Sequence, residues 1–289
     1  MKLAIFSVVV FVLLLGACAY EQPASTEGES LPYASRYRPL DSVATLLAGA
    51  TVLTGTGERL DGADVLMRDG KIVAVGSELD AGDATSIDAS GMWITPGVID
   101  VHSHLGVYAS PGVAAHSDGN EMSKPVTAEV WAEHAVWPQD PGFVTALAGG
   151  VTSMQILPGS GNLIGGRGVT LKNVPGRNVM DMKFPGAPYG LKMACGENPK
   201  RFYGDLGKSP MTRMGNVAGY RTAWIEAADY RDKMAAAEGG AGEAPMRDLK
   251  LETLTGVLDG EILVHNHCYR ADEMSLMLDV AKEFDYRVS

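Results

Sequence analysis

Short apolar runs alternate with amphipathic stretches from Gly97 to residue 289, and this alternation constrains the fold more than any other feature. Each apolar run is long enough for one buried strand, and the stretch after it can form a helix that covers that strand. This order is typical of a parallel α/β architecture, in which helices return the chain to the start of the next strand. The predicted strands are residues 97–104, 150–159, 189–196 and 261–268.

Residues 45–96 show a different pattern. In "DVLMRDGKIVAVG" two β-rich runs meet at Asp69-Gly70, and such a dipeptide between alternating apolar residues strongly indicates a two-residue hairpin. We therefore expect a small antiparallel β unit before the α/β part, which comprises residues 97–289.

Two pairs of histidines end two of the predicted strands. His102 and His104 end the first, and His265 and His267 end another about 160 residues later. Residues two apart on a strand share a face, and imidazole nitrogens at the carboxyl ends of parallel strands can hold one cation. A single pair would often be ordinary core or surface histidines. Two pairs among six histidines favour a metal site.

The first 44 residues have the composition of an export segment followed by a tether. Residues 1–17 contain one basic residue, an apolar stretch and a small-residue end, which is the layout of a signal peptide. "LGAC" resembles the lipoprotein cleavage box, so lipid on Cys18 would anchor the protein to a membrane. An ordinary cleaved signal with a chance cysteine is the alternative. The polar residues 18–44 are typical of a tether.

Net charge and cysteine content exclude some functions. The formal charge of −11 comes without clustered Lys and Arg, which argues against nucleic acid as a partner. Cys195 and Cys268 each end an apolar run, and we expect both to be buried free thiols without a catalytic role.

The segments "GMWITPGVIDVHSHLG", "GGVTSMQILPGSGNLIGGRG", "GLKMACGENPKR" and "LVHNHCYRADEM" together resemble the amidohydrolase superfamily from about Leu46 onward. They are most similar to its imidazolonepropionase-like and Xaa-Pro dipeptidase-like branch. The resemblance implies a (β/α)₈ TIM-type barrel, of which this chain holds about five of eight strands, preceded by a β-sandwich subdomain. It also implies hydrolysis of a C–N bond in a small-molecule substrate, with one or two ions of Zn²⁺ or another divalent metal.

The resemblance assigns roles to individual residues. His102 and His104 match the first-strand metal ligands, and His267 matches the fifth-strand ligand. His265 shares the face of His267 but lies one pleat deeper, so it is expected to line the wall or support the ligands.

Two residues of "GLKMACGENP" are candidates for the bridging carboxylate that two-metal relatives need. Lys192 alternates with apolar neighbours, which turns it towards the barrel interior, where carboxylation by CO₂ would make it an anion. Glu197 follows the strand end and is the other candidate. Lys192 is slightly favoured. The alternatives are a Lys192 ammonium paired with an acid and a Glu197 that merely starts a helix.

Loops after the strands offer further candidates for substrate contacts. The glycines of residues 158–168 fit neither the dinucleotide-binding nor the P-loop spacing, so a turned loop at the barrel mouth is expected there. This disfavours a cofactor-dependent oxidoreductase. Arg167 within it is either a ligand for a substrate carboxylate or a solvated side chain. Tyr108, His116 and Asp118 lie in a long loop that follows the first histidine pair, where barrel enzymes shape specificity.

The implied chemistry is attack by a metal-activated water on a carbonyl carbon, with proton transfer by a general base. In the superfamily that base is an aspartate ending the eighth strand, which would lie beyond residue 289, so no catalytic residue is assigned. We expect the isolated chain to be an inactive, poorly soluble fragment. The alternative from another class is a non-catalytic, lipid-anchored metal-binding domain or pseudoenzyme. The sequence identifies neither the substrate nor the oligomeric state.

Overall fold

The computed structural model describes residues 33–289, and its contacts define a compact unit from Ser35 to Ser289. The predicted signal peptide and Cys18 lie outside the described residues. Within the described range, no helix combines the length and apolarity needed to cross a membrane.

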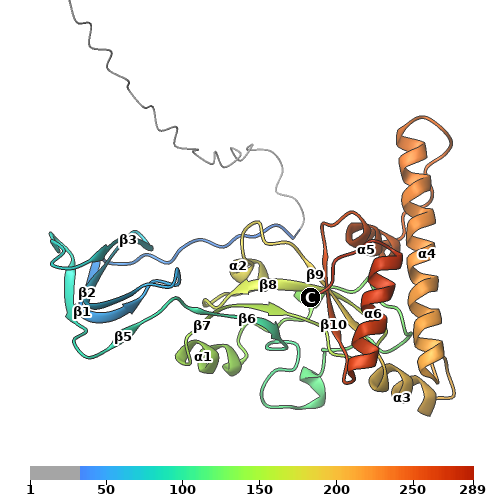
Figure 1. Cartoon of the computed structure of the whole chain (residues 1–289), viewed down its shortest axis with the longest axis horizontal. Helices are drawn as coiled ribbons and strands as arrows, with labels where there is room; N and C mark the ends of the chain where they lie inside the picture. Colours follow the sequence, from blue (N-terminus) through green and yellow to red (C-terminus); the bar gives the residue numbers. More distant parts are fainter. Residues whose placement is uncertain (1–32) are drawn as a thin grey trace, which may run out of the picture. The chain divides into compact units, whose positions relative to one another are not determined.

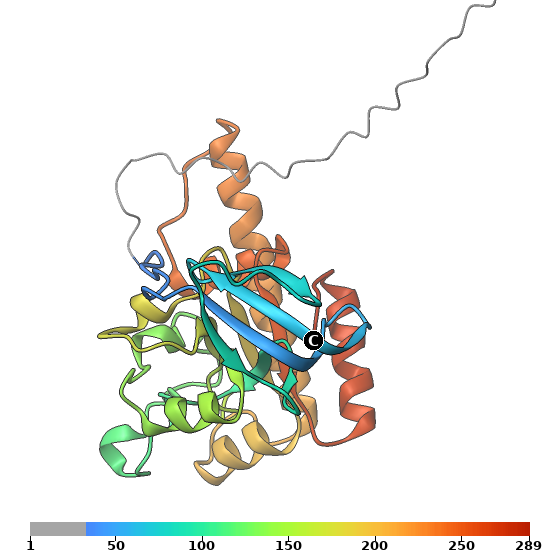
Figure 2. The same ribbon diagram turned by 90° about the vertical axis from the view of Figure 1, so that its left-hand side faces the viewer.

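The N-terminal β unit is a five-stranded sheet with the order β3-β2-β1-β4, in which β5 also pairs with β1. Figure 2 faces this sheet and shows its twisted strands in blue to green. The strands are β1 (Thr45–Leu53), β2 (Arg59–Arg68), β3 (Lys71–Gly76), β4 (Thr85–Asp88) and β5 (Trp93–Ile94). Its buried face carries small and β-branched side chains, namely Ala50, Val52, Ala63, Val65 and Ala89.

The predicted hairpin is confirmed, because β2 and β3 pair in antiparallel fashion with Asp69 and Gly70 at positive φ between them. The prediction of a purely antiparallel unit is wrong. Strands β4 and β5 both run parallel to β1: β4 pairs with its first half, at Thr45 to Ala48, and β5 continues along it at Thr51 and Val52. The described residues form one sheet here, so its pairing into a sandwich stays a prediction.

The second sheet has the order β10-β9-β8-β7-β6 (Figure 1). Its strands are β6 (Val98–Ser103), β7 (Val151–Ile156), β8 (Ile164–Lys172), β9 (Gly190–Ala194) and β10 (Leu263–His267). The four predicted strands are therefore present as β6, β7, β9 and β10. Pairs β6–β7 and β9–β10 are parallel as expected.

Strand β8 was not predicted. Residues 158–163 form a loop as expected, but residues 164–168 belong to β8, which corrects that part of the prediction. It runs antiparallel to both neighbours, β7 and β9. Its glycines permit a crowded strand: a Cβ on Gly166 would lie 2.4 Å from the Val130 carbonyl oxygen, and one on Gly168 would lie 2.8 Å from that of Ile156. The sheet is thus mixed, and an eight-stranded barrel stays a prediction.

Helices cover the sheet over two buried cores. The α-helices are α1 (Pro141–Ala148), α2 (Val179–Met182), α3 (Glu197–Asp205), α4 (Arg213–Glu238), α5 (Leu249–Leu258) and α6 (Ala271–Glu283), and the short 3₁₀ helices are η1 (Ala114–His116) and η2 (Ala132–His134). Helices α4, α5 and α6 lie beside β9 and β10 (Figure 1). Their side chains pack on these strands in a core that includes Trp224 and Leu191. Phe143 of α1 and Met182 of α2 pack on β7 and β8.

The start of the compact unit lies within the predicted tether. Ser35 Oγ donates a hydrogen bond to the Lys183 carbonyl, and the Arg36 backbone N–H donates one to the Met180 carbonyl. The Arg36 guanidinium also contacts Asn178 and Asp181. Residues 35–36, within the predicted tether, are therefore bound to α2 and its flanks.

Candidate metal and active site

Three strands bring the predicted ligands to one face of the second sheet. In the parallel pairing of β9 with β10, Lys192 lies opposite His265 and Ala194 lies opposite His267. Their neighbours Met193 and Val264 point the other way, into the core under the helices. Strand β6 contributes His102, and His104 follows directly after it. The alternation along β9 and β10 thus separates a polar face from an apolar one.

Lys192 lies at the centre of this polar face. Its Nζ is 3.1 Å from His102 Nε2 and donates a hydrogen bond to the Pro158 carbonyl at 3.2 Å. The side chain is 1% exposed, and no salt bridge to it is found among the residues that the structure describes. Lys192 is therefore not the lysine paired with an acid that the alternative interpretation required.

Burial and mutual repulsion favour the uncharged forms of these groups. Burial, followed by the charges of Lys192 and the other histidines, lowers the pKa of His102 to about 4. Burial lowers the pKa of Lys192 to about 8. The pKa values of His104, His265 and His267 are also lowered, first by burial and then with a contribution from Lys192. Neutral imidazoles are the form that binds metal ions.

The imidazoles of the first pair are held in definite orientations. The rings of His102 and His104 are 5.1 Å apart and nearly perpendicular. His104 Nδ1 is 2.8 Å from the Leu157 carbonyl oxygen, so this nitrogen donates a proton to it and leaves Nε2 as the available ligand atom. Tyr108 packs its ring 5.8 Å from that of His104 and hydrogen-bonds Asn120 through its hydroxyl.

The loop after His104 is fixed by Asp140, a residue that sequence reasoning missed. Its buried carboxylate accepts hydrogen bonds from the backbone N–H groups of Gly106, Ser110 and Gly142. Asp140 also caps α1 ahead of Pro141. The Asp-Pro dipeptide is a helix-start signal that predicts the cap but not the two long-range bonds.

Asn198 is a second residue that the sequence did not single out. It lies in the first turn of α3, and its amide nitrogen donates to Ser160 Oγ at 2.8 Å. The same nitrogen is 3.5 Å from His267 Nε2 and 3.4 Å from Tyr269 Oη. These polar groups surround the exposed side of His267.

The remaining predicted candidates lie away from Lys192. Glu197 starts α3, pairs with Arg201 at 3.8 Å and has a side chain that is 54% exposed. Arg167 lies opposite Leu191 in the β8–β9 pairing, and its guanidinium packs over Trp131 and donates to Thr253. It is therefore neither a solvated loop side chain nor on the face of Lys192. His116 stacks on Trp137.

A hollow of about 580 Å³ adjoins this face. Pro158 connects the two, because its carbonyl accepts the Lys192 hydrogen bond and its ring lines the hollow. Other parts of the lining come from the loop after His104 and from η2 with its flanks, including Val107, Asp118, Asn120, Trp131 and His134.

The prediction that Cys195 and Cys268 are free thiols is wrong. The structure joins them in a disulfide with a Cα–Cα distance of 5.1 Å. The register of β9 and β10 places the two cysteines opposite each other just beyond the paired residues, which a reading of each strand by itself does not reveal.

The donor set fits a divalent metal ion only with the help of Lys192. Among residues 33–289, no three His, Cys, Asp or Glu side chains are grouped closely enough to hold a metal ion. The group that lies 3.1 Å from His102 is instead the amine of Lys192. A carboxylated Lys192 would supply an anionic oxygen ligand to a cluster that otherwise offers only neutral nitrogen.

No family model matches the chain, but individual known proteins are similar to it. The sequence is 35% identical over 248 residues to amidohydrolase tasK of Hapsidospora irregularis, covering 78% of this chain and 25% of that protein. The crystal structure of an amidohydrolase from Thermotoga maritima superposes with a TM-score of 0.79 at 38% identity. It covers 84% of this chain and 63% of the other. The chain belongs to the amidohydrolase superfamily.

Shorter matches of this chain point to the same superfamily. The D-hydantoinase of Geobacillus stearothermophilus is 43% identical over 60 residues, which covers 21% of this chain and 12% of that protein. Proteins named amidohydrolase and hydantoinase hydrolyse carbon–nitrogen bonds. The amidohydrolase chain spans a quarter of the length of tasK and under two thirds of the Thermotoga maritima chain.

Proposed function

We propose that the complete protein is a metal-dependent hydrolase that cleaves a C–N bond of an amide, cyclic amide or peptide-like small molecule. The observation that carries this proposal is Lys192, which is buried, has no acidic partner among residues 33–289 and lies 3.1 Å from His102 Nε2. An amine in such a place is costly unless it is neutral or modified. Together with the membership in the superfamily, this favours Lys192 over the exposed Glu197 as the bridging ligand.

In this proposal His102, His104, His267 and carboxylated Lys192 hold Zn²⁺ or another divalent ion. The ion, when bound, lowers the pKa of a water ligand and polarises the scissile carbonyl. The protein's own groups orient that site: the Leu157 carbonyl fixes the ring of His104, and Asp140 fixes the loop that follows. Tyr108 and Asn198, next to His104 and His267, are positioned to contact substrate.

Metal content and hydrolysis test the proposal. The full-length protein and its His102→Asn, Lys192→Met and His267→Asn variants would be analysed for bound metal by mass spectrometry after purification in bicarbonate. We expect each variant to lose metal at least tenfold more readily than wild type, because each removes a ligand. His116→Asn is the matched control, since the His116 ring packs against Trp137 at 4.7 Å and its Nδ1 lies 3.2 Å from the Pro111 carbonyl oxygen.

Hydrolysis would be measured against N-acyl amino acids, Xaa-Pro dipeptides and cyclic amides. Activity that depends on metal and is lost in the three variants would support the proposal. Unchanged metal content in all three variants would refute the assigned ligands. Metal binding without any hydrolysis would favour the non-catalytic alternative.

We also propose that the protein is exported and anchored by lipid on Cys18. Support comes from the signal-like residues 1–17 and from the disulfide, because disulfides persist mainly in oxidising compartments. Mass spectrometry of the membrane-extracted protein should find an acylated N-terminal Cys18. A mature protein that starts elsewhere would contradict the anchor.

A further inference from the structure

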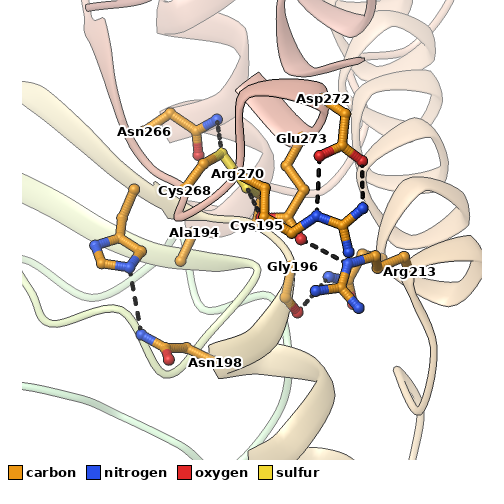
Figure 3. The surroundings of a disulfide bond; sticks show 12 residues. Ala194, Cys195, Gly196, Asn198, Arg213, Asn266, Cys268, Arg270, Asp272 and Glu273 are labelled. Atoms are coloured by element: carbon orange, nitrogen blue, oxygen red, sulfur yellow. Dashed lines mark hydrogen bonds and ion pairs between the residues drawn. A yellow bond between two sulfur atoms is a disulfide. The ribbon is translucent and has the colours of Figure 1, made fainter. Parts of the chain in front are cut away.

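Strands β9 and β10 are each followed directly by a cysteine, and the pairing of the strands brings the two together. Lys192 lies opposite His265, an offset of 265 − 192 = 73, and Cys195 and Cys268 are separated by the same 73 positions. The disulfide is therefore the continuation of the β9–β10 ladder beyond its last paired residues. Figure 3 shows it between the end of β9 and the segment after β10.

The disulfide lies on the side of the sheet away from the candidate ligands. Cys195 belongs to the apolar core with Met193, and Cys268 packs against that core. Lys192 and His267 alternate with these residues and face the opposite side. The disulfide can therefore hold the strand ends in position. Its sulfur atoms do not compete for a metal ion, because they lie on the other side of the sheet.

Backbone contacts connect the disulfide directly to the candidate ligand His267. The Cys195 N–H donates a 2.8 Å hydrogen bond to the His267 carbonyl, and Cys268 is the next residue in the chain. Beyond the disulfide, Glu273 of α6 forms an ion pair with Arg213 of α4 and covers Gly196, whose φ is +68° (Figure 3). A Cβ at Gly196 would lie 2.3 Å from Glu273 Oε1, so this corner is closely packed.

We propose that Cys195 and Cys268 are positioning residues for the metal site: their disulfide holds the end of β10, with His267, against the end of β9, with Lys192. The inference rests on the proposed function. The bond forms when the two thiols give up two protons and two electrons to a disulfide oxidant, whose own sulfur–sulfur bond is reduced to two thiols. Protein made in a reducing compartment would lack this restraint.

Mass spectrometry and cobalt binding test the inference on the full-length protein. Peptides carrying Cys195 and Cys268 should be cross-linked until a reductant is added. Co²⁺ alone would then be titrated in bicarbonate buffer and followed by its visible absorption, which reports ligand number and geometry. For Cys195→Ala/Cys268→Ala we expect binding at least tenfold weaker and an altered spectrum, as for other residues that orient metal ligands. Cys18→Ser is the matched control and should bind as wild type.

The outcomes separate this inference from the proposed function. Free thiols in the oxidised protein, or a double variant with unchanged affinity and spectrum, would overturn the positioning role. If the double variant loses its circular dichroism signal, Co²⁺ binding is compared instead between oxidised wild type and wild type whose disulfide has been reduced and from which the reductant has then been removed. If the double variant and the reduced wild type both lose their structure, the disulfide is a purely structural bond, and the positioning role is overturned. Wild type that is cross-linked but binds no Co²⁺ would refute the proposed function, and the positioning role with it.

Discussion

Replacing Lys192 with methionine should stabilise the metal-free protein at neutral pH relative to wild type. The lysine is 1% exposed, and its Nζ contacts a carbonyl oxygen and an imidazole, neither of which is an anion. Methionine has a similar volume and no charge to bury. The change therefore removes the cost of keeping an ammonium in this place.

The magnitude follows from the lowered pKa of Lys192. A fall from 10.5 to about 8 corresponds to about 3 kcal/mol of folding free energy. Because the folded pKa lies below the unfolded one, the unfolded wild type binds more protons between about pH 8 and 10.5, and wild-type stability rises with pH there. Below about pH 8 both states are protonated and the full cost is present. The Lys192→Met variant lacks this dependence.

Urea denaturation in the presence of a chelator, at several values between pH 7 and 10.5, measures the effect. The stability advantage of Lys192→Met over wild type should shrink by about 3 kcal/mol across this range. Lys208→Met, which alters an exposed lysine, should show no such change. If the difference in free energy of unfolding between Lys192→Met and wild type stays constant with pH, the reasoning is refuted.

Three further substitutions test the surroundings of the site by urea denaturation. Asp140→Ala should cost about 3 kcal/mol, because it leaves three backbone N–H groups without their acceptor; a loss below about 1 kcal/mol would contradict this. Gly166→Ala should cost more than about 2 kcal/mol because of its φ of +119° and the nearby Val130 carbonyl, whereas Gly112→Ala, with open space around it, should be nearly neutral. Arg167→Met should cost about 1 kcal/mol without changing Co²⁺ affinity, and weaker Co²⁺ binding would show that Arg167 acts on the metal site.

The strands that carry the histidines could be predicted from sequence, because their apolar runs have strand length and end in polar groups. Strand β8 could not be predicted, because glycine has low strand propensity and three glycines in five residues suggest a loop. In the structure those glycines are required by the carbonyl groups that approach β8, and such contacts come from segments far away in sequence.

The candidate ligands that lie at the ends of strands could be predicted from sequence. The face of Lys192 followed from simple alternation, which is a local property. Local alternation could not reveal that no acid of the described part of the chain pairs with Lys192. Nor could it reveal the backbone contacts of Asp140 or the pairing of Cys195 with Cys268. Each of these depends on which strands and loops are neighbours in space.

If the protein is lipid-anchored as proposed, the hydrogen bonds of Ser35 and Arg36 to α2 and its flanks would limit how far the fold can move from the membrane. With lipid on Cys18, as proposed, about 17 residues separate the anchor from the first fixed point, and a fully extended chain of that length reaches about 60 Å. The fold would then sample only a thin layer of solvent above the bilayer, and any substrate of the proposed hydrolase would have to diffuse into that layer to meet it.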